Sequence, residues 1–251
     1  MRNTFVPGVG GVLSADIAVP DHANQVSFYA KVLTTGDAPL WRDDLMNNEG
    51  TPVIGLGERT PEYENLPLQW MPHFQVADVA ASYAAAIELG GKEILRDEGF
   101  AWAGLEDPCG AAFGIIPAVD PDSLGAQANE NVGCIAWLSL RVPDPKGCRE
   151  FYEKVIGWKS KASSEAEGDA SHFEMQIGDN HSVAEIGDVS AEIQNMGALW
   201  LMHLPVGDLE TSLSNVTEQG GEVVAKVTDP DCVVLRDPVG VCFALVEVKR
   251  R

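Results

Sequence analysis

Positively charged residues are scarce in this chain. It contains 17 lysines and arginines against 38 aspartates and glutamates, which gives a formal net charge of −21 at pH 7. A surface of this sign repels polyanions at long range, so we expect neither nucleic acid nor an acidic membrane surface as a partner. The acidic excess also favours solubility, and that is its simplest interpretation.

Cysteine is scarce as well. The five cysteines are odd in number, and no two of them have the spacing of a CxxC motif. This pattern argues against a disulfide framework and against a zinc knuckle. We therefore expect reduced thiols with structural roles in a cytoplasmic protein.

Long apolar runs are absent, which argues against a membrane span. The N-terminus MRNTFVPGVG has no apolar stretch behind a basic start, so no signal peptide is predicted. The remaining composition is that of an ordinary globular protein, with 45% hydrophobic residues. At 251 residues, the chain has the length at which two compact units become expected.

The sequence contains many internally repeated motifs. The pattern Trp-x-x-His-x-x-Val-x-Asp occurs at 70–78 and again at 200–208, an offset of 130. Other motifs keep an offset of 123 or 130: Pro-Asp at 20 and 143, Phe-Tyr at 28 and 151, Gly-Gly at 90 and 220, and Asp-Pro-x-Gly at 107 and 237. Two duplicated modules explain these offsets, with seven extra residues (130 minus 123) in the second copy.

The modules are predicted to span residues 1–118 and 132–251. The polar, Gly- and Pro-containing stretch 119–131 is interpreted as the linker between them.

Each module shows the same order of local patterns. Residues 12–19 and 135–142 alternate as strands with one apolar face. Aspartates precede the expected helices, Gly-Gly pairs end two of them, and Asp-Pro-x-Gly fits a type I turn before the last strand. We predict an α+β fold of two tandem βαβββ modules, related by a pseudo-twofold axis, whose curled mixed sheets enclose a concave cavity.

Strand parity predicts where a binding site lies. Trp70 and His73 fall on opposite faces of one strand, as do Trp200 and His203 in the second copy. If the tryptophans are packed in the core, the histidine side chains point into the cavity. The predicted substrate-binding residues on this face are Asp16, His73, Gln75, Trp137, Arg141, Glu185 and His203.

The paired motifs Pro-Asp followed by Phe-Tyr-x-Lys-Val, and Asp-Pro-x-Gly before each last strand, resemble those of the vicinal oxygen chelate superfamily. This superfamily includes glyoxalases, bleomycin resistance proteins and extradiol dioxygenases. The resemblance covers nearly the whole chain and is nearest to the fused two-module glyoxalase/bleomycin resistance type. The resemblance is strong evidence for the fold but weak evidence for the chemistry.

The resemblance also implies four positions per module at which the superfamily keeps its metal ligands. They are occupied by Ser14, Gly55, Met71 and Gly114 in the first module and by Trp137, Glu185, Leu201 and Ala244 in the second. Of these, Glu185 alone is a plausible donor, whereas a divalent metal needs three or four converging donors. We therefore predict no metal and no cofactor.

Several alternatives stay open at this point. A displaced metal site could combine Glu185 and His203 with His172 or His181. Asp16 and Arg141 could form a salt bridge across the module interface, and Trp137 could fill the space of a lost metal.

The sequence thus predicts a small-molecule binding protein with degenerate metal sites, as a monomer or a homodimer, whose partner is a small organic molecule. A metal-independent acid–base enzyme, or a metal-dependent lyase or dioxygenase that uses Glu185 and His203, is the alternative. Whether the protein is an enzyme is left open.

Overall fold

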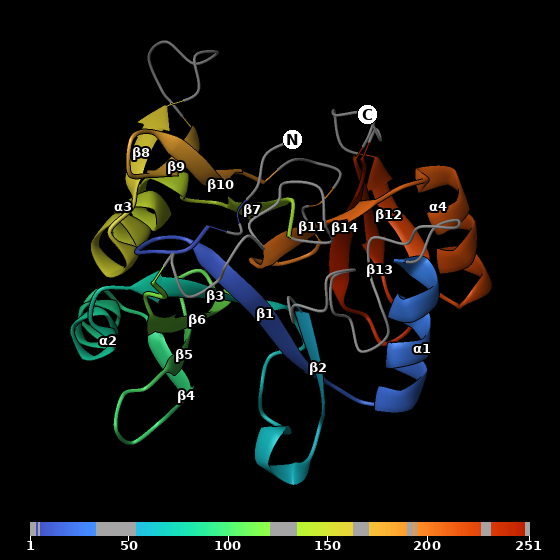
Figure 1. Ribbon diagram of the computed structural model, residues 1–251, viewed down its shortest axis with the longest axis horizontal. Coiled ribbons are helices and arrows are strands. Elements are labelled where there is room, and N and C mark those ends of the chain that lie inside the picture. The colour runs from blue at the N-terminus through green and yellow to red at the C-terminus, as the bar shows by residue number, and fades with distance from the viewer. Residues whose placement is uncertain are drawn as a thin grey trace.

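A computed structural model describes residues 4, 6–33, 54–120, 135–162, 171–189, 193, 195–226 and 232–248. The two repeats form two mixed sheets with helices packed between and beside them (Figure 1). The predicted linker lies outside the described residues from position 121 onward.

The first repeat supplies one sheet. Its elements are β1 (Val12–Val19), α1 (His22–Val32), β2 (Ile54–Glu58), the short 3-10 helix η2 (Pro61–Tyr63), β3 (Met71–Val76), α2 (Val79–Glu88), β4 (Lys92–Arg96), β5 (Ala103–Glu106) and β6 (Ala112–Pro117). The strand order is β2-β1-β3-β6-β5-β4. Strands β1 and β2 are parallel, as are β3 and β6, whereas β1 and β3 are antiparallel.

The second repeat supplies a larger sheet. Its elements are β7 (Trp137–Val142), α3 (Pro145–Ile156), β8 (Lys159–Ala162), β9 (His172–Ile177), β10 (His181–Asp188), β11 (Trp200–Val206), α4 (Leu209–Glu218), β12 (Glu222–Lys226), β13 (Cys232–Arg236) and β14 (Cys242–Glu247). The strand order is β12-β13-β14-β11-β7-β10-β9-β8.

The predicted α+β class and the tandem βαβββ units are confirmed, and the structure adds a second level of repetition. The second repeat contains the unit twice, as β7-α3-β8-β9-β10 and as β11-α4-β12-β13-β14. In the first repeat, β3-α2-β4-β5-β6 is a complete unit. The second module is therefore a pair of units, and in the described part of the first module β1, α1 and β2 precede one complete unit. The sequence patterns did not reveal this second level of repetition.

The helix signals of the sequence act as expected at α2 and α4, whereas Asp21 before α1 makes no side-chain cap. The Asp78 carboxylate accepts a hydrogen bond from the Ala81 N–H at 2.9 Å, and Asp208 caps α4 through Thr211 in the same way. After these helices, Gly90 and Gly220 have φ values of 90° and 85°. Such left-handed conformations close a helix and favour glycine.

The two repeats share one core. Helix α1 lies against α4, and α2 lies against α3, so each helix pair joins one helix from either repeat (Figure 1). The ring of Phe74 in the first repeat lies 5.4 Å from that of Trp200 in the second. The indole of Trp158 donates a hydrogen bond to the Gly10 carbonyl at 2.7 Å.

The duplicated motifs meet at this shared core. Tyr29 of the first Phe-Tyr motif donates a hydrogen bond to Asp237 of the second Asp-Pro-x-Gly turn, at 3.0 Å. Tyr152 donates one to Asp107 of the first turn, also at 3.0 Å. This reciprocity is what a pseudo-twofold relation between the repeats produces. None of the described helices has the length and apolar character of a membrane-spanning segment.

Candidate functional site

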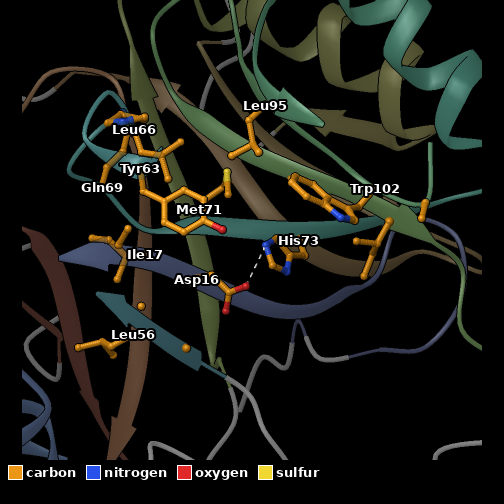
Figure 2. Close-up of a pocket in the computed structure, with 17 residues that line it drawn as sticks. Asp16, Ile17, Leu56, Tyr63, Leu66, Gln69, Met71, His73, Leu95 and Trp102 are labelled. Carbon is orange, nitrogen blue, oxygen red and sulfur yellow. Dashed lines mark ion pairs between the residues drawn. The ribbon is translucent and has the colours of Figure 1, made fainter. Parts of the chain in front are cut away.

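A cavity of about 620 Å³ lies on the first sheet, on the face opposite to the buried Phe74 (Figure 2). Strands β1, β2, β3 and β6 form its floor. Large apolar side chains dominate its lining: Tyr63, Leu66, Met71, Leu95, Trp102 and Ile116. The predicted concave cavity is thus present in the first repeat.

The polar end of the cavity is a pair of side chains from adjacent strands. His73 Nε2 lies 3.5 Å from Asp16 Oδ2, the contact drawn as a dashed line in Figure 2. The Ser14 hydroxyl oxygen lies 2.9 Å from His73 Nδ1. The His73 side chain is 16% exposed and that of Asp16 is 56% exposed, so the carboxylate faces the opening.

Burial lowers the pKa of His73, and the nearby Asp16 charge opposes this effect without reversing it. The ring is therefore neutral at pH 7. We assign the tautomer in which Nε2–H points to Asp16 and the Ser14 hydroxyl donates to Nδ1. The cavity then presents one carboxylate charge, and no Lys or Arg occurs among the described lining residues.

Two glycines create the space for this pair. A Cβ atom on Gly114 would lie 2.5 Å from Cδ2 of His73, and one on Gly55 would collide with the Asp16 carboxylate. These are two of the positions at which the superfamily resemblance places metal ligands. His73 and Asp16 thus occupy the space that ligand side chains would need.

The residues present do not fit the superfamily's metal. Ser14 is engaged by His73, Met71 offers a thioether, and the two remaining positions have no side chain. Within the described ranges, no group of three or more His, Cys, Asp or Glu side chains is arranged to hold a metal ion.

In the second repeat, Glu185 is held by two basic partners. Its carboxylate pairs with Arg141 and lies 3.4 Å from Nε2 of His172. Burial raises the pKa of Glu185, but the His172 hydrogen bond and the Arg141 charge outweigh it and bring the pKa to about 2. The interpretation of Asp16 and Arg141 as partners of each other is wrong, since Asp16 pairs with His73.

His203 has partners of its own. Its Nε2 lies 2.9 Å from the Ser139 hydroxyl, and its Nδ1 lies 3.4 Å from the Cys232 sulfur. Ser139 corresponds to Asp16 through the offset of 123, and the negative charge that acts on His203 is that of Glu185. The Cys232 contact was not predicted, because 29 residues separate the two positions in the chain.

Gln75 and Trp137 do not line the described cavity. Gln75 is fully buried, and its side chain binds the backbone of Val6, Gly8 and Val119 at 2.8–3.0 Å. We assign it the role of fixing the N-terminal segment. Trp137 is 6% exposed in the second sheet, paired with His203 across the strands.

The sequence patterns missed much of the apolar lining. Trp102 is an example: it precedes β5, whose residues Ala103 and Leu105 are buried in the core. Strand parity could have placed Trp102 on the opposite face. Tyr63 and Leu66 lie at and after η2, where no periodicity marks a direction.

The matching face of the second repeat is packed differently. The offset of 130 relates Met71 to Leu201 and Trp102 to Cys232. Leu201 and Cys232 belong to a buried apolar cluster with Ala225, Val234, Cys242 and Ala244. The two repeats have therefore diverged on this face.

Mixed sheets built from tandem βαβββ units around a concave cavity define the fold of the vicinal oxygen chelate superfamily. The chain belongs to the family of the Glyoxalase-like domain, whose model matches residues 13–116 and 137–246. The comparison with curated protein sequences found no match.

Solved structures share this fold. The Mn(II)-bound glyoxalase from Novosphingobium aromaticivorans is 15% identical, with 96% of this chain and 83% of that chain covered and a TM-score of 0.54. The 2,3-dioxygenase LapB from Pseudomonas sp. KL28 is 12% identical, with 97% and 94% covered and a TM-score of 0.53. The complex of homoprotocatechuate 2,3-dioxygenase from Brevibacterium fuscum with 3,4-dihydroxyphenylacetate is 14% identical, with 97% and 82% covered and a TM-score of 0.56. At such identities the likeness concerns the fold alone.

Proposed function

We propose that the protein binds a small organic molecule in the first-repeat cavity without a metal ion. The ligand has an apolar, aromatic body and a head that is cationic or donates a hydrogen bond. The observation that carries this proposal is an apolar cavity with a charged end, formed by His73 and Asp16. Gln69 also lines the cavity, and its side-chain amide is bonded to the backbone of Gly110 and Ala112.

The volume and the lining of the cavity support a ligand with an apolar body. Small-molecule sites typically have volumes of about 300–1,000 Å³ with mostly apolar walls and few polar groups, and this cavity has about 620 Å³. Trp102 is 38% exposed at its edge and Tyr63 lies across from it (Figure 2). Their rings offer large contact area to a planar ligand. One fold relative binds 3,4-dihydroxyphenylacetate, which is an aromatic molecule.

The negative charge of Asp16 at the polar end supports a ligand head group that is cationic or donates a hydrogen bond. The Asp16 carboxylate accepts hydrogen bonds, and no cation of the described lining neutralises it. The net charge of −21 adds a negative field around the opening. A cationic or hydroxyl head is favoured, and a carboxylate head is repelled.

A metal-independent proton-transfer enzyme is the second candidate, and one observation favours it. His73 is a neutral imidazole whose Nδ1 accepts a hydrogen bond from the Ser14 hydroxyl and whose Nε2–H points to Asp16, so it is placed to act as a general base toward the Ser14 hydroxyl. Glu185, in contrast, is a weak proton acceptor, because its pKa is about 2. Chemical change of a bound ligand, lost in His73→Gln, would distinguish this enzyme from a binding protein.

Three probes with one naphthyl body and different heads test the proposal by calorimetric titration: 2-(1-naphthyl)ethylamine, 2-(1-naphthyl)ethanol and 1-naphthylacetate. We expect the amine to bind best and the carboxylate worst. In Asp16→Asn, the amine should lose about fivefold in affinity, as a partly exposed ion pair contributes about 1 kcal/mol.

Glu58→Gln is the matched control, since Glu58 is an exposed carboxylate at the end of β2 outside the lining. It removes one negative charge and should leave the order and affinities unchanged. Equal binding of all three probes, or tightest binding of the carboxylate, would contradict the proposed ligand class.

A further inference from the structure

One aromatic side chain at the edge of the cavity follows a turn with unusual backbone geometry. Trp102 lines the cavity, and its ring stands at the cavity edge in Figure 2. It ends the connection between β4 and β5, in which Phe100 has a φ of 57°. This left-handed conformation is uncommon for a bulky residue, whereas glycine adopts it without strain.

We propose that Trp102 is the specificity-determining residue for the planar body of the ligand, and that Asp97 and Phe100 are positioning residues that hold its ring at the cavity edge. The inference rests on the proposed function, because it concerns the same cavity. It assigns the selection of a flat body over a saturated one to a single side chain.

Hydrogen bonds to Asp97 fix the turn. Its carboxylate Oδ2 accepts the N–H groups of Gly99 at 2.8 Å and Ala101 at 3.1 Å. Its carbonyl accepts from the Phe100 N–H at 3.1 Å, and its own N–H donates to the Trp102 carbonyl at 3.2 Å. These bonds close the turn and set the direction in which the Trp102 side chain leaves the backbone.

The ring of Phe100 offsets its unfavourable backbone conformation. The guanidinium of Arg96 lies 4.7 Å from the centre of this ring, and the ring of Tyr83 lies 5.3 Å from it. Nε of Arg96 in turn donates to the Glu93 carboxylate at 3.1 Å. Cation–π and edge-to-face contacts of this kind are stabilising. Strained residues that their surroundings hold in place cluster at ligand-binding sites, and Trp102 of the cavity edge follows this one closely in the chain.

These side chains are special to the first repeat. The offset of 130 relates Tyr83, Glu93, Phe100 and Trp102 to Leu213, Val223, Pro230 and Cys232. No aromatic or acidic side chain recurs at these places in the second repeat. The common fold therefore does not require the group, and it accompanies the cavity of the first repeat.

The test compares 2-(1-naphthyl)ethylamine with its saturated decahydronaphthyl analogue by calorimetric titration. Both molecules carry the same amine, so the contact with Asp16 is the same and the flatness of the body differs. We expect the wild type to prefer the naphthyl amine by about fivefold, because stacked rings contribute beyond their buried area. Trp102→Leu should bind the two amines equally well, and it should fold, because Trp102 is 38% exposed.

Variants of the turn separate position from charge. In Asp97→Ala the turn loses its carboxylate acceptor, so the preference should disappear, as it should in Phe100→Val, whose branched side chain disfavours a positive φ. Asp97→Asn removes the same charge but retains an oxygen acceptor, and it should keep the preference. Glu98→Gln is the matched control, since Glu98 is an exposed carboxylate of the same turn. It should also keep the preference.

The position of Trp102 is also measured without a ligand. In protein labelled with 5-fluorotryptophan, the Trp102 fluorine signal is identified by its absence in Trp102→Phe. We expect a single narrow signal that shifts or broadens in Asp97→Ala and returns in Asp97→Asn. An unchanged signal in Asp97→Ala would contradict the positioning role of Asp97.

The outcomes distinguish this inference from the proposed function. Failure of both amines to bind the wild type would overturn the proposed function and the inference with it. Binding of both amines with equal affinity by the wild type, or a preference that Trp102→Leu retains, would overturn the inference and leave the proposed function standing.

Discussion

Single side chains of the duplicated motifs hold the two repeats together. The Tyr152 hydroxyl donates to Asp107 and accepts from the Trp200 indole at 2.8 Å, with all three groups buried. Burial raises the pKa of Asp107, and the hydrogen bonds it accepts oppose this rise. Each lost donor would leave a buried acceptor unsatisfied, which is costly.

Tyr152→Phe should therefore destabilise the protein by about 1–3 kcal/mol, through loss of the bonds to Asp107 and Trp200. Tyr29→Phe is the matched variant in the first repeat, where Asp237 loses its donor. Urea unfolding of both variants measures the effect. A change below about 0.5 kcal/mol in both, the range of ordinary surface substitutions, would contradict this role.

The pairing of Glu185 predicts a pH dependence of stability. Its pKa is lowered from the reference value of 4.5 in the unfolded chain to about 2 in the folded protein. Its contribution is therefore fully present above about pH 4.5 and is lost as the pH falls toward 2. Glu185→Gln should cost about 2 kcal/mol at pH 7, an estimate reduced for partial exposure, and much less near pH 2.

Unfolding free energies of the wild type and Glu185→Gln at pH 7 and pH 3 measure this difference. Glu58→Gln provides the comparison with an exposed carboxylate. A difference that stays constant between the two pH values would show that the carboxylate charge is not the cause.

At the residue scale, the sequence predicts the strand face on which a side chain lies better than it predicts the residues that this side chain contacts. Parity placed His73 on the face opposite to Trp70, and the structure has it there, at the cavity wall. The partner of Glu185 depends on the register of three strands, in which β10 lies between β7 and β9. No pattern within one strand contains that register, so the sequence connected His172 to Glu185 only as one alternative in a displaced metal site and did not connect Arg141 to Glu185.

At the scale of elements, the cavity depends on a glycine in each of two strands. Gly55 of β2 lies beside Asp16 of β1, and Gly114 of β6 lies beside His73 of β3. The close approach of each glycine to its neighbour leaves no room for a Cβ atom. The polar end of the cavity is thus set jointly by four strands.

Gly55→Ala should displace the Asp16 carboxylate and weaken binding of the naphthylethylamine probe by about fivefold, the loss expected for Asp16→Asn. Gly57→Ala on the same strand is the matched control, because its Cβ would meet only the Ile17 carbonyl oxygen at 3.8 Å. Calorimetric titration compares the two variants. Equal affinities of the two variants for the probe would contradict the role assigned to Gly55.

The elements themselves were well predicted where local chemistry fixes them. The caps at Asp78 and Asp208 and the glycine ends of their helices are in place. The second level of repetition was missed, because β8 and β9 lie in the stretch where the offset changes from 123 to 130, and no duplicated motif marks them. The apolar lining at Tyr63 was missed because it lies in a connection without periodicity.

At the scale of the molecule, the repeats are predicted to unfold together. Rings from both repeats interleave: Phe28 lies 6.2 Å from Phe243, and Phe74 lies 4.9 Å from Trp158. A shared core couples the two sheets into one cooperative unit. The module boundaries at 118 and 132 remain a prediction of the sequence, as does the choice between monomer and homodimer.

Urea unfolding followed by far-ultraviolet circular dichroism and by tryptophan fluorescence should therefore give one coincident transition. The tryptophans report well, since Trp70, Trp158 and Trp200 are buried in the shared core. Two separate transitions would indicate that each repeat is stable alone.

The central claim is that a ligand binds in the first-repeat cavity, and methyl resonances of labelled methionines test it most directly. Met71 lines the cavity, whereas Met202 is fully buried in the core of the second sheet. On titration with 2-(1-naphthyl)ethylamine, we predict that the Met71 methyl signal shifts, with nuclear Overhauser contacts to the naphthyl protons, while the Met202 signal stays in place. Saturable binding that leaves Met71 unchanged would contradict the account.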